Sequence, residues 1–527
     1  MIKLDITLPV GYTSDDIKAA VCSRIPVARE EICDTELLRR TLDLSVDGAP
    51  KYKCTVAISA TAEREAGLLK IRNKVFPYEK RVFTPTPCRL DFRPVVVGAG
   101  PCGLLAALIL AEAGARPILL ERGLAAEERV RKVDTFNTLG ILDPECNVQF
   151  GEGGAGTFSD GKLKSGSMDE YKLRVLTEFI AAGADGDITY SATAHLGTDK
   201  LPTIVSRIRE KIISLGGEVI FGAKVTKLGI NDGKLHSVTY IKDGATSELD
   251  TRAAVIAVGH SARDTLEMLY GLGLPMQARG FGVGVRIEHP REHIDRIVYG
   301  GSYGLIESTA SYHLVTHLPS GRSVYSFCMC PGGSVVAATS EKESVVTNGM
   351  SEHARMGENS NAALLVSVTP ADFDSEHPLA GIEYQRRIEQ TAYRATSSYK
   401  APVSRLSDFM EGKSTHSFGD CRPTYPLGTE PMLLDTVLPG YVTDSLRAGL
   451  EDFDAWLPGY MYPDSPLTAP ETRTTSPVRI MRAENGCAIG FEGIYPAGEG
   501  AGYAGGIVSS ATDGIRMAEK LLKSFEN

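Results

Sequence analysis

Continuous apolar runs divide this chain into a few buried segments, and the best defined of them surround a short glycine-rich turn. Val95-Val96-Val97 is apolar throughout, residues 104–113 are almost entirely apolar, and residues 117–120 are apolar again before Glu121. Short apolar runs without alternation are typical of parallel strands buried on both faces, and a longer run favours a buried helix. The pattern predicts a strand–turn–helix–strand unit over residues 93–122.

The turn of this unit, GAGPCG, predicts a dinucleotide site. Its first glycine permits a tight turn, the second lets the backbone approach a pyrophosphate, and the third allows close helix packing at a positive helix N-terminus. An acid 23 residues after the first glycine stands where a ribose diol is bound. The alternative is a glycine turn in an ordinary βαβ unit. The predicted contacts are Gly98, Gly100, Pro101, Gly103, Glu121 and Arg122.

A second glycine-rich segment, residues 147–163, has five glycines in 17 residues. That density excludes an ordinary helix or central strand, so we expect a loop lying against the cofactor, with a surface loop as the alternative. Residues 224–229 and 253–259 read as strands, and the second ends in glycine where a strand would return beneath the adenine side of the cofactor. A plain core strand has the same pattern. The predicted contacts here are Gly153, Gly154, Ser159, Lys162, Val225 and Gly259.

The far C-terminal segment repeats the opening pattern. Residues 493–520 predict a strand, a glycine turn and a helix that begins near residues 505–506. A protein that binds only NAD has no need of this second turn, whereas the longer FAD molecule can use a helix N-terminus directed at its flavin. The pattern therefore favours FAD over NAD. The predicted contacts are Gly498, Glu499, Gly505, Gly506 and Ile507.

The order of the patterns predicts an α/β fold: a three-layer, Rossmann-like FAD-binding domain with an inserted mixed α+β substrate domain and a small N-terminal α+β domain. We expect boundaries at 1–88, 89–279, 280–475 and 476–527. Residues 280–475 change to short alternating strands, mostly antiparallel. Residues 1–88 carry 14 Lys/Arg against 12 Asp/Glu, so they are either a docking unit or a recognition module for RNA or protein.

Net charge and cysteine content further narrow the possible classes of protein and of binding partner. The formal net charge of -10 argues against bulk binding to nucleic acid or to an anionic membrane. The first residues lack the basic start and apolar core of a signal peptide, and the most apolar segment carries too many glycines and charges for a membrane span. Ten scattered cysteines suit reduced thiols in the cytoplasm. No zinc spacing is present, so we expect no metal.

The candidate catalytic residues are chosen for the chemistry of their side chains more than for a sequence motif. Cys328 and Cys330, in SFCMCPGG, would lie on one side of a strand as a redox or nucleophilic pair, although cysteine is also a common core residue. His260 directly follows an apolar strand and is a candidate acid or base, with a surface histidine as the alternative. One of Arg473, Arg479 and Arg482, with Arg479 as the first choice, could bind a carboxylate substrate, unless these arginines form structural ion pairs.

Several of these stretches together resemble a family of bacterial FAD-dependent dehydrogenases of unassigned reaction: VVVGAGPCGLLAALILAEAG, NVQFGEGGAGTFSDGKL, HLGTDKLPTIV, FGVGVRIEHP, FCMCPGG and YPAGEGAGYAGGIVSSATDGI. The resemblance implies FAD held between the two glycine turns. It leads us to expect an oxidoreductase acting on a small organic substrate or an electron-transfer partner. Only one full nucleotide fingerprint is present, so NADH or NADPH, if it is the donor, would dock transiently. The alternative is a flavin-containing protein that modifies or binds RNA through residues 1–88.

Overall fold

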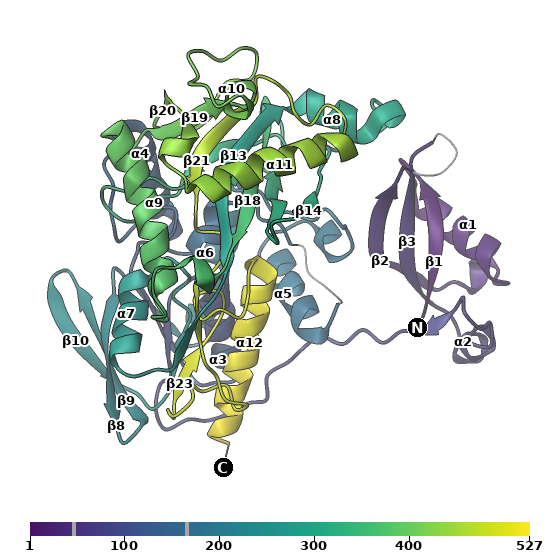
Figure 1. Ribbon diagram of the computed structural model, residues 1–527. Coiled ribbons are helices and arrows are strands. Elements are labelled where there is room, and N and C mark those ends of the chain that lie inside the picture. Colours follow the sequence, from purple (N-terminus) through teal and green to yellow (C-terminus); the bar gives the residue numbers. More distant parts are fainter. Residues whose placement is uncertain (45–48, 164–167, 527) are drawn as a thin grey trace.

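The structure is a computed structural model that describes residues 1–44, 49–163 and 168–526 (Figure 1). Its centre is a five-stranded sheet in the order β23-β11-β5-β6-β7, in which every neighbouring pair is parallel. The predicted unit over residues 93–122 forms β5, α3 and β6 at its middle. The strands are β5 (Val95–Val97), β6 (Ile118–Glu121), β7 (Glu218–Phe221), β11 (Ala254–Ile256) and β23 (Ile494–Pro496).

Both faces of the parallel sheet are covered, which is why its strands are apolar without alternation. Val96 and Leu119 belong to the core shared with the helices on one face, and their neighbours Val95 and Leu120 belong to the core on the other face. The first face carries α3 (Pro101–Glu112), α5 (Glu170–Ala181), α6 (Leu201–Ser214) and α12 (Ile507–Ser524). The second face carries α7 (Arg263–Gly271) and an antiparallel sheet of β8 (Lys224–Asn231), β9 (Lys234–Lys242) and β10 (Ala245–Asp250). The expected three layers are present.

The inserted segment forms a seven-stranded sheet in the order β14-β15-β18-β13-β21-β19-β20, antiparallel except for β19 and β20. Its entry and exit run side by side as the pair β12 (Met276–Ala278) and β22 (Val478–Ile480). One face packs on α11, the long yellow-green helix labelled in Figure 1. The strands are β13 (Phe281–Pro290), β14 (Val315–His317), β15 (Ser323–Cys330), β18 (Asn359–Val368), β19 (Ala401–Arg405), β20 (Thr429–Pro431) and β21 (Pro466–Glu471). The accompanying elements are α8 (Arg291–Tyr299), α9 (Ala380–Thr396), α10 (Leu406–Met410), α11 (Gly440–Trp456), β16 (Ser334–Ala337) and β17 (Thr347–Met350); α4 (Ala126–Leu139) precedes the insertion.

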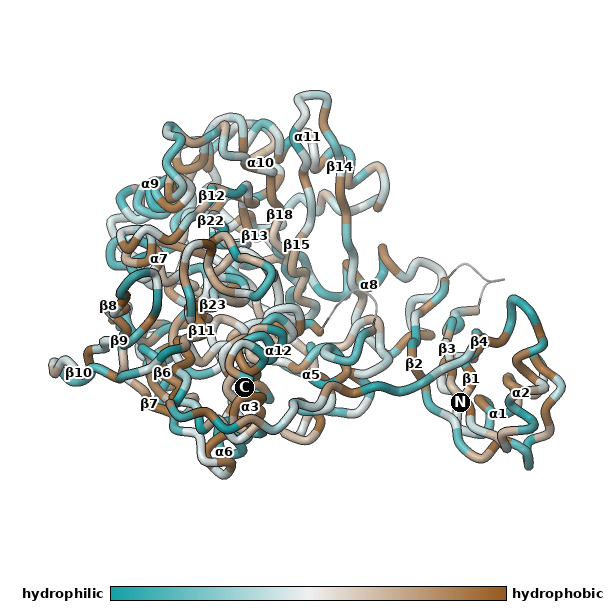
Figure 2. The backbone as a smooth tube through the Cα atoms, turned by 90° about the horizontal axis from the view of Figure 1, so that it is seen from below, coloured by the Kyte–Doolittle hydropathy of each residue, from teal (hydrophilic) through white to brown (hydrophobic). Residues whose placement is uncertain are grey.

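The N-terminal unit stands beside this body in both views (Figures 1 and 2). It is a four-stranded sheet of β1 (Ile2–Pro9), β2 (Asp34–Asp43), β3 (Lys51–Ser59) and β4 (Phe76–Pro77), with α1 (Ser14–Arg24) and α2 (Ala62–Leu68). Backbone hydrogen bonds join Arg40 to Tyr190 and Ala192 of the body. Phe83 already packs in the core of the FAD-binding part, stacked on Tyr171. The proposed boundary at residue 88 thus includes a few residues that contact the body.

Candidate functional site

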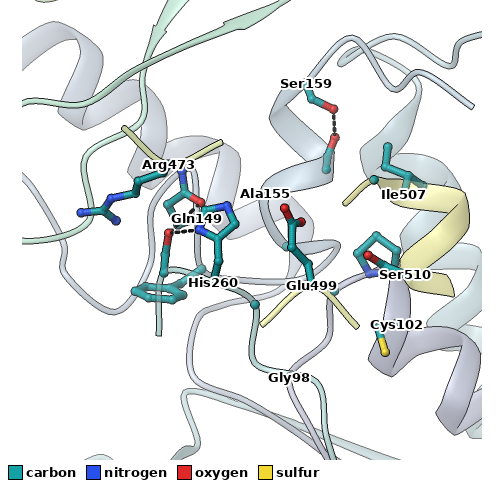
Figure 3. A pocket seen from close by; sticks show the side chains of 18 of the residues that line it. Gly98, Cys102, Gln149, Ala155, Ser159, His260, Arg473, Glu499, Ile507 and Ser510 are labelled. Carbon is teal, nitrogen blue, oxygen red and sulfur yellow. Dashed lines mark hydrogen bonds between the residues drawn. The ribbon is translucent and has the colours of Figure 1, made fainter. Parts of the chain in front are cut away.

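A cavity of about 450 Å³ has walls from both the parallel sheet and the inserted sheet (Figure 3). Most of the predicted cofactor contacts line it, although they come from segments far apart in the sequence. Those that line it are Gly98, Gly100, Pro101, Glu121, Arg122, Gly154, Ser159, Lys162, Val225, Gly259, Glu499, Gly505, Gly506 and Ile507. The fold therefore gathers these predicted contacts around one cavity.

The first glycine turn has the geometry that its sequence predicts. Gly98 has φ +99°, and a Cβ there would lie 2.5 Å from the Ala257 carbonyl oxygen. A Cβ on Gly103 would lie 1.8 Å from the Gly98 carbonyl oxygen, so this glycine serves packing and does not line the cavity. At Gly100 a Cβ would meet only the Gly154 Cα, at 3.9 Å. Gly100 is therefore kept open toward the cavity.

Two helices direct their N-termini at the cavity. Gly100 is the N-cap of α3 and Gly506 is the N-cap of α12; no side chain of the described residues caps either helix, and neither has an acid in its first turn. Among the other described helices, a threonine or aspartate side chain caps each of α1, α2 and α5, whereas α6 and α11 also lack both a side-chain cap and a first-turn acid. Uncapped first-turn N–H groups need acceptors and favour negative charge. A ligand with acceptor groups at two separated points fits this arrangement.

Glu121 ties the two glycine-rich segments together. Its Oε2 accepts a 2.7 Å hydrogen bond from the Ala99 N–H, and its Oε1 accepts 2.9 Å bonds from the N–H groups of Gly123 and Gly151. A carboxylate has about four acceptor positions, so one remains for a ribose hydroxyl. The sequence predicted the ribose contact but not this second role.

The neighbouring Arg122 is held in place by two acids and a ring. Its guanidinium forms a bidentate pair with Asp264 at 2.9 Å, bonds Glu145, and lies 4.2 Å from the centre of the Phe150 ring. Lys224 joins the same two acids. Burial alone would raise the pKa of Asp264, but its hydrogen bonds and charge pairing with Arg122 and Lys224 hold the pKa well below the usual range. This end of the cavity is rigid and polar.

Three predicted residues lie behind the cavity wall. A Cβ on Gly153 would lie 2.0 Å from Thr157 Oγ1, and one on Gly498 would lie 2.9 Å from Cys102. Arg479 also lies outside the lining: its Nε donates to the Gly502 carbonyl and its guanidinium covers the Tyr503 ring. In this structure Arg479 supports the C-terminal glycine turn.

The cysteine pair lies at the inserted-sheet end, where Cys328 lines the cavity and Cys330 is buried behind it. The strand is not regular here, because a bulge falls between Phe327 and Cys330 and Cys328 has φ +43°. The two sulfurs are nevertheless 4.0 Å apart. A hydrogen bond from Cys330, with the nearby charges of Lys162 and Arg286, lowers the pKa of Cys328 to about 6.

His260 lines the cavity beside Glu499 (Figure 3). Its Nδ1 lies 3.0 Å from Ser261 Oγ, which in turn donates to Gln149. Burial, followed by the charges of Arg473 and Arg263, lowers the pKa of His260 to about 3. The imidazole is therefore neutral at ordinary pH, which disfavours a role as imidazolium acid. Burial also raises the pKa of Glu499 to about 7.

Sequence reasoning missed two polar residues of the wall, Asn348 and Glu471, whereas Arg473 was one of three arginines considered for a carboxylate and is the one of the three that lines the cavity. Arg473 bonds Glu389 of α9 at 2.8 Å, and Glu389 also pairs with Arg263 of α7. Glu471 ends a strand that had no polar motif of its own. Only the pairing of distant strands brings Asn348 and Glu471 to the cavity, so no local signal could have found these two residues.

The glycine-lined turn, the acid at the second strand and the two open helix N-termini together suit a dinucleotide with a flavin at its far end. They define an FAD-binding flavoprotein, and FAD is its cofactor. Residues 91–143 match the family described as "FAD binding domain", and residues 280–474 match "FAD-dependent protein, C-terminal domain-like". The chain belongs to a family of bacterial FAD-dependent proteins whose reaction is unassigned.

A relative from Clostridium beijerinckii, an uncharacterised protein, is 42% identical over 530 residues, covering 99% of this chain and 98% of the relative. Among solved structures, a mutant of the halogenase PltM in complex with FAD is 11% identical with a TM-score of 0.39, covering 82% of this chain and 70% of its own. A flavoprotein/dehydrogenase from Cytophaga hutchinsonii is 13% identical with a TM-score of 0.35, covering 82% and 79%. Similarity at this level says nothing about the reaction.

Two further features concern membranes and metals. Within the described ranges, every helix is too short or too polar to cross a bilayer. In that same part of the chain, no three His, Cys, Asp or Glu side chains gather in a way that would hold a metal ion.

Proposed function

We propose that this protein is an FAD-dependent oxidoreductase, of dehydrogenase or reductase type, that acts on a small organic substrate at the inserted-sheet end of the cavity. The observation that carries the proposal is the continuity of one cavity. Its wall runs from the glycine turn to Cys328, Glu471 and Asn348. FAD, when bound, supplies two-electron transfer. The domain organisation at 1–88, 89–279, 280–475 and 476–527 is part of this proposal.

The chain's own residues have distinct roles in it. The α3 N-terminus and Glu121 hold the nucleotide half of the cofactor, while the α12 N-terminus offers N–H donors to negative charge further along the cavity. Neutral His260, fixed by Ser261, serves as a hydrogen-bonding group. Cys328 is the candidate nucleophile or redox thiol, because a thiol with a lowered pKa is reactive as the thiolate.

Anaerobic reduction tests this function. The holoprotein is mixed with NADH, with NADPH and with a panel of small organic acids and alcohols, and the visible flavin absorbance is followed. Bleaching by one of these donors, reversed by an added acceptor, is the expected result. A bound flavin that dithionite reduces and that none of the donors reduces would count against the proposal.

A further inference from the structure

The inserted sheet presents a polar surface to the cavity. Along β13 the residues at odd positions, such as Val285 and Ile287, enter the hydrophobic core under α11. The alternate position, Arg286, is fully buried on the other face. Its Nη1 donates to the Cys328 carbonyl and its Nη2 to Asn348 Oδ1, both at 3.3 Å. Since Cys328 and Asn348 line the cavity, the guanidinium lies directly behind the wall.

Around Arg286 the described part of the chain leaves a group of buried polar atoms without hydrogen-bond partners. Glu471 Oε2 lies 3.5 Å from Arg286 Nε, yet neither atom forms a hydrogen bond. Thr468 is the register partner of Arg286, and a Cβ on Gly349 would lie about 2 Å from both Asn361 Oδ1 and Arg286 Nη2. Buried polar atoms are almost always paired; of this group, Glu471 is the member that lines the cavity, so it is the one that a polar ligand can reach. The atoms without a hydrogen bond among the described residues are Arg286 Nε, Glu471 Oε2, Asn361 Nδ2 and Oδ1, Thr347 Oγ1 and Thr468 Oγ1.

Positive charge exceeds negative charge at this wall. Lys162 lines the cavity and has no ion pair among the residues that the structure describes, and Arg286 stands behind the wall. The neighbouring charges are already balanced: Asp160 pairs with Arg355, and Arg473 pairs with Glu389. Lys162 therefore faces this end of the cavity, and Arg286 lies behind the wall with Glu471 3.5 Å away.

The acidic groups that face these cations do not neutralise both. Burial outweighs the charge of Arg286 and raises the pKa of Glu471 to about 8, so near pH 7 this carboxyl is mostly protonated and can donate a hydrogen bond. The lowered pKa of Cys328 favours its thiolate, which offsets part of the positive charge of Lys162 and Arg286.

We propose that the wall formed by Lys162, Asn348 and Glu471 binds the carboxylate of a small organic acid, which is the substrate class of this site. Lys162 supplies the ion pair, Glu471 donates a hydrogen bond, and the buried Arg286 adds positive potential. A carboxylate offers one charge and two acceptor oxygens, which matches the lysine without an ion pair and the available donors. The proposal rests on the proposed function, because it assigns the substrate end of the same cavity.

A binding titration tests this subsite without any turnover. The holoprotein is titrated with benzoate or propionate and, separately, with benzamide, and the visible spectrum of the bound flavin is followed. We expect a saturable change with an acid and none with the uncharged amide at the same concentration. An equal response to benzamide, or no response to either acid, overturns the subsite. A failure here with a flavin that organic donors still reduce leaves the proposed function intact.

Two variants separate a specific role from a structural one. Lys162→Gln should weaken binding of the acid by at least about tenfold, as loss of a charged contact does, whereas Lys227→Gln, an exposed lysine on β8 outside the lining, should not change it. Unchanged affinity in Lys162→Gln, or loss of FAD from it, overturns the assignment of this lysine to the substrate.

In the unsubstituted protein, acid binding should weaken as pH rises through about 8, when Glu471 loses its proton. The other groups facing Glu471 titrate elsewhere: Cys328 near 6, Cys330 above its ordinary value, and Arg286 higher still. Glu471→Gln keeps a donor at every pH and should give a flat profile over this range. A profile that still falls in Glu471→Gln overturns the role of the carboxyl.

Discussion

The backbone N–H of Ala99 donates a 2.7 Å hydrogen bond to Oε2 of Glu121. The acid at the end of β6 thereby fixes the first glycine turn, and through Gly151 it also fixes the second glycine-rich segment. Glu121 therefore shapes the nucleotide end of the cavity before any ligand binds. Its remaining acceptor position is the one that a ribose hydroxyl would use.

Glu121→Gln should weaken FAD binding by about tenfold to a hundredfold and lower the thermal midpoint. The amide replaces one acceptor with an NH₂ group that faces backbone donors, and each charge-assisted hydrogen bond is worth about 1.5–3 kcal/mol. Flavin fluorescence titration and thermal unfolding measure both effects. Glu128→Gln, on the exposed side of α4, is the matched control. Unchanged FAD affinity in Glu121→Gln would refute this role.

Gly100→Val should abolish FAD retention while the chain still folds. A Cβ at this position meets no protein atom closer than 3.9 Å, so the added side chain enters the cavity where we place the pyrophosphate. Gly103→Ala should instead destabilise the fold, since its Cβ would collide with the Gly98 carbonyl. Flavin content and circular dichroism of the two variants distinguish these outcomes. A normal flavin content in Gly100→Val would move the cofactor elsewhere.

Glu389→Gln should cost about 3–5 kcal/mol in the free energy of unfolding, because the buried Arg263 and Arg473 then keep only Glu341, which Arg386 shares, as counter-charge. Burial raises the pKa of Glu389, but the two guanidiniums outweigh burial and hold it well below the usual range. A depressed pKa stabilises the folded state above the ordinary value near 4.5 and loses that contribution as pH falls below it.

Urea unfolding of both proteins at neutral and acidic pH measures this effect, with exposed Glu376→Gln as the control. The difference between the original protein and Glu389→Gln should shrink as the pH falls below about 4.5. An equal difference at both pH values would contradict the ion-pair explanation.

Cys328 in the flavin-free protein should react with iodoacetamide with a midpoint near pH 6, the value to which Cys330, Lys162 and Arg286 lower its pKa. Cys330→Ala removes the largest of these effects, the hydrogen bond, and should move the midpoint upward. Mass spectrometry of labelled peptides gives the profile, with exposed Cys33 as the internal reference. The pairing of the two thiols is wrong if Cys330→Ala leaves the midpoint unchanged.

The parts of the fold that sequence predicted are those that local pattern controls. The unit from Val95 to Glu121 and the closing strand, turn and helix α12 followed from apolar runs, glycine positions and length. The antiparallel character of residues 280–475 followed from alternation. The pattern of apolar and polar residues is weaker at the ends of the helices and strands. The sequence around Cys328 alternates regularly, so it gives no sign of the bulge there.

The polar wall could not be predicted, because its residues come from separate strands and only the fold brings them together. In the sequence, Glu471 ends a strand without a polar motif. Only the fold brings Arg286, from another strand, within 3.5 Å of it. Arg479 was proposed as a substrate ligand from its position before the C-terminal turn. In the fold its guanidinium is engaged by the Gly502 carbonyl and the Tyr503 ring. Tertiary packing gives Arg286 and Arg479 their different surroundings, and no single segment of the sequence encodes that packing.

The most direct test of the whole account is the flavin content of the purified protein. The visible spectrum is recorded, the chromophore is released by acid, and the released molecule is identified and counted against protein. The account predicts FAD at close to one molecule per chain in the original protein and almost none in Gly100→Val. A colourless protein that also fails to take up added FAD would contradict it, and the two glycine turns would then have to serve another ligand.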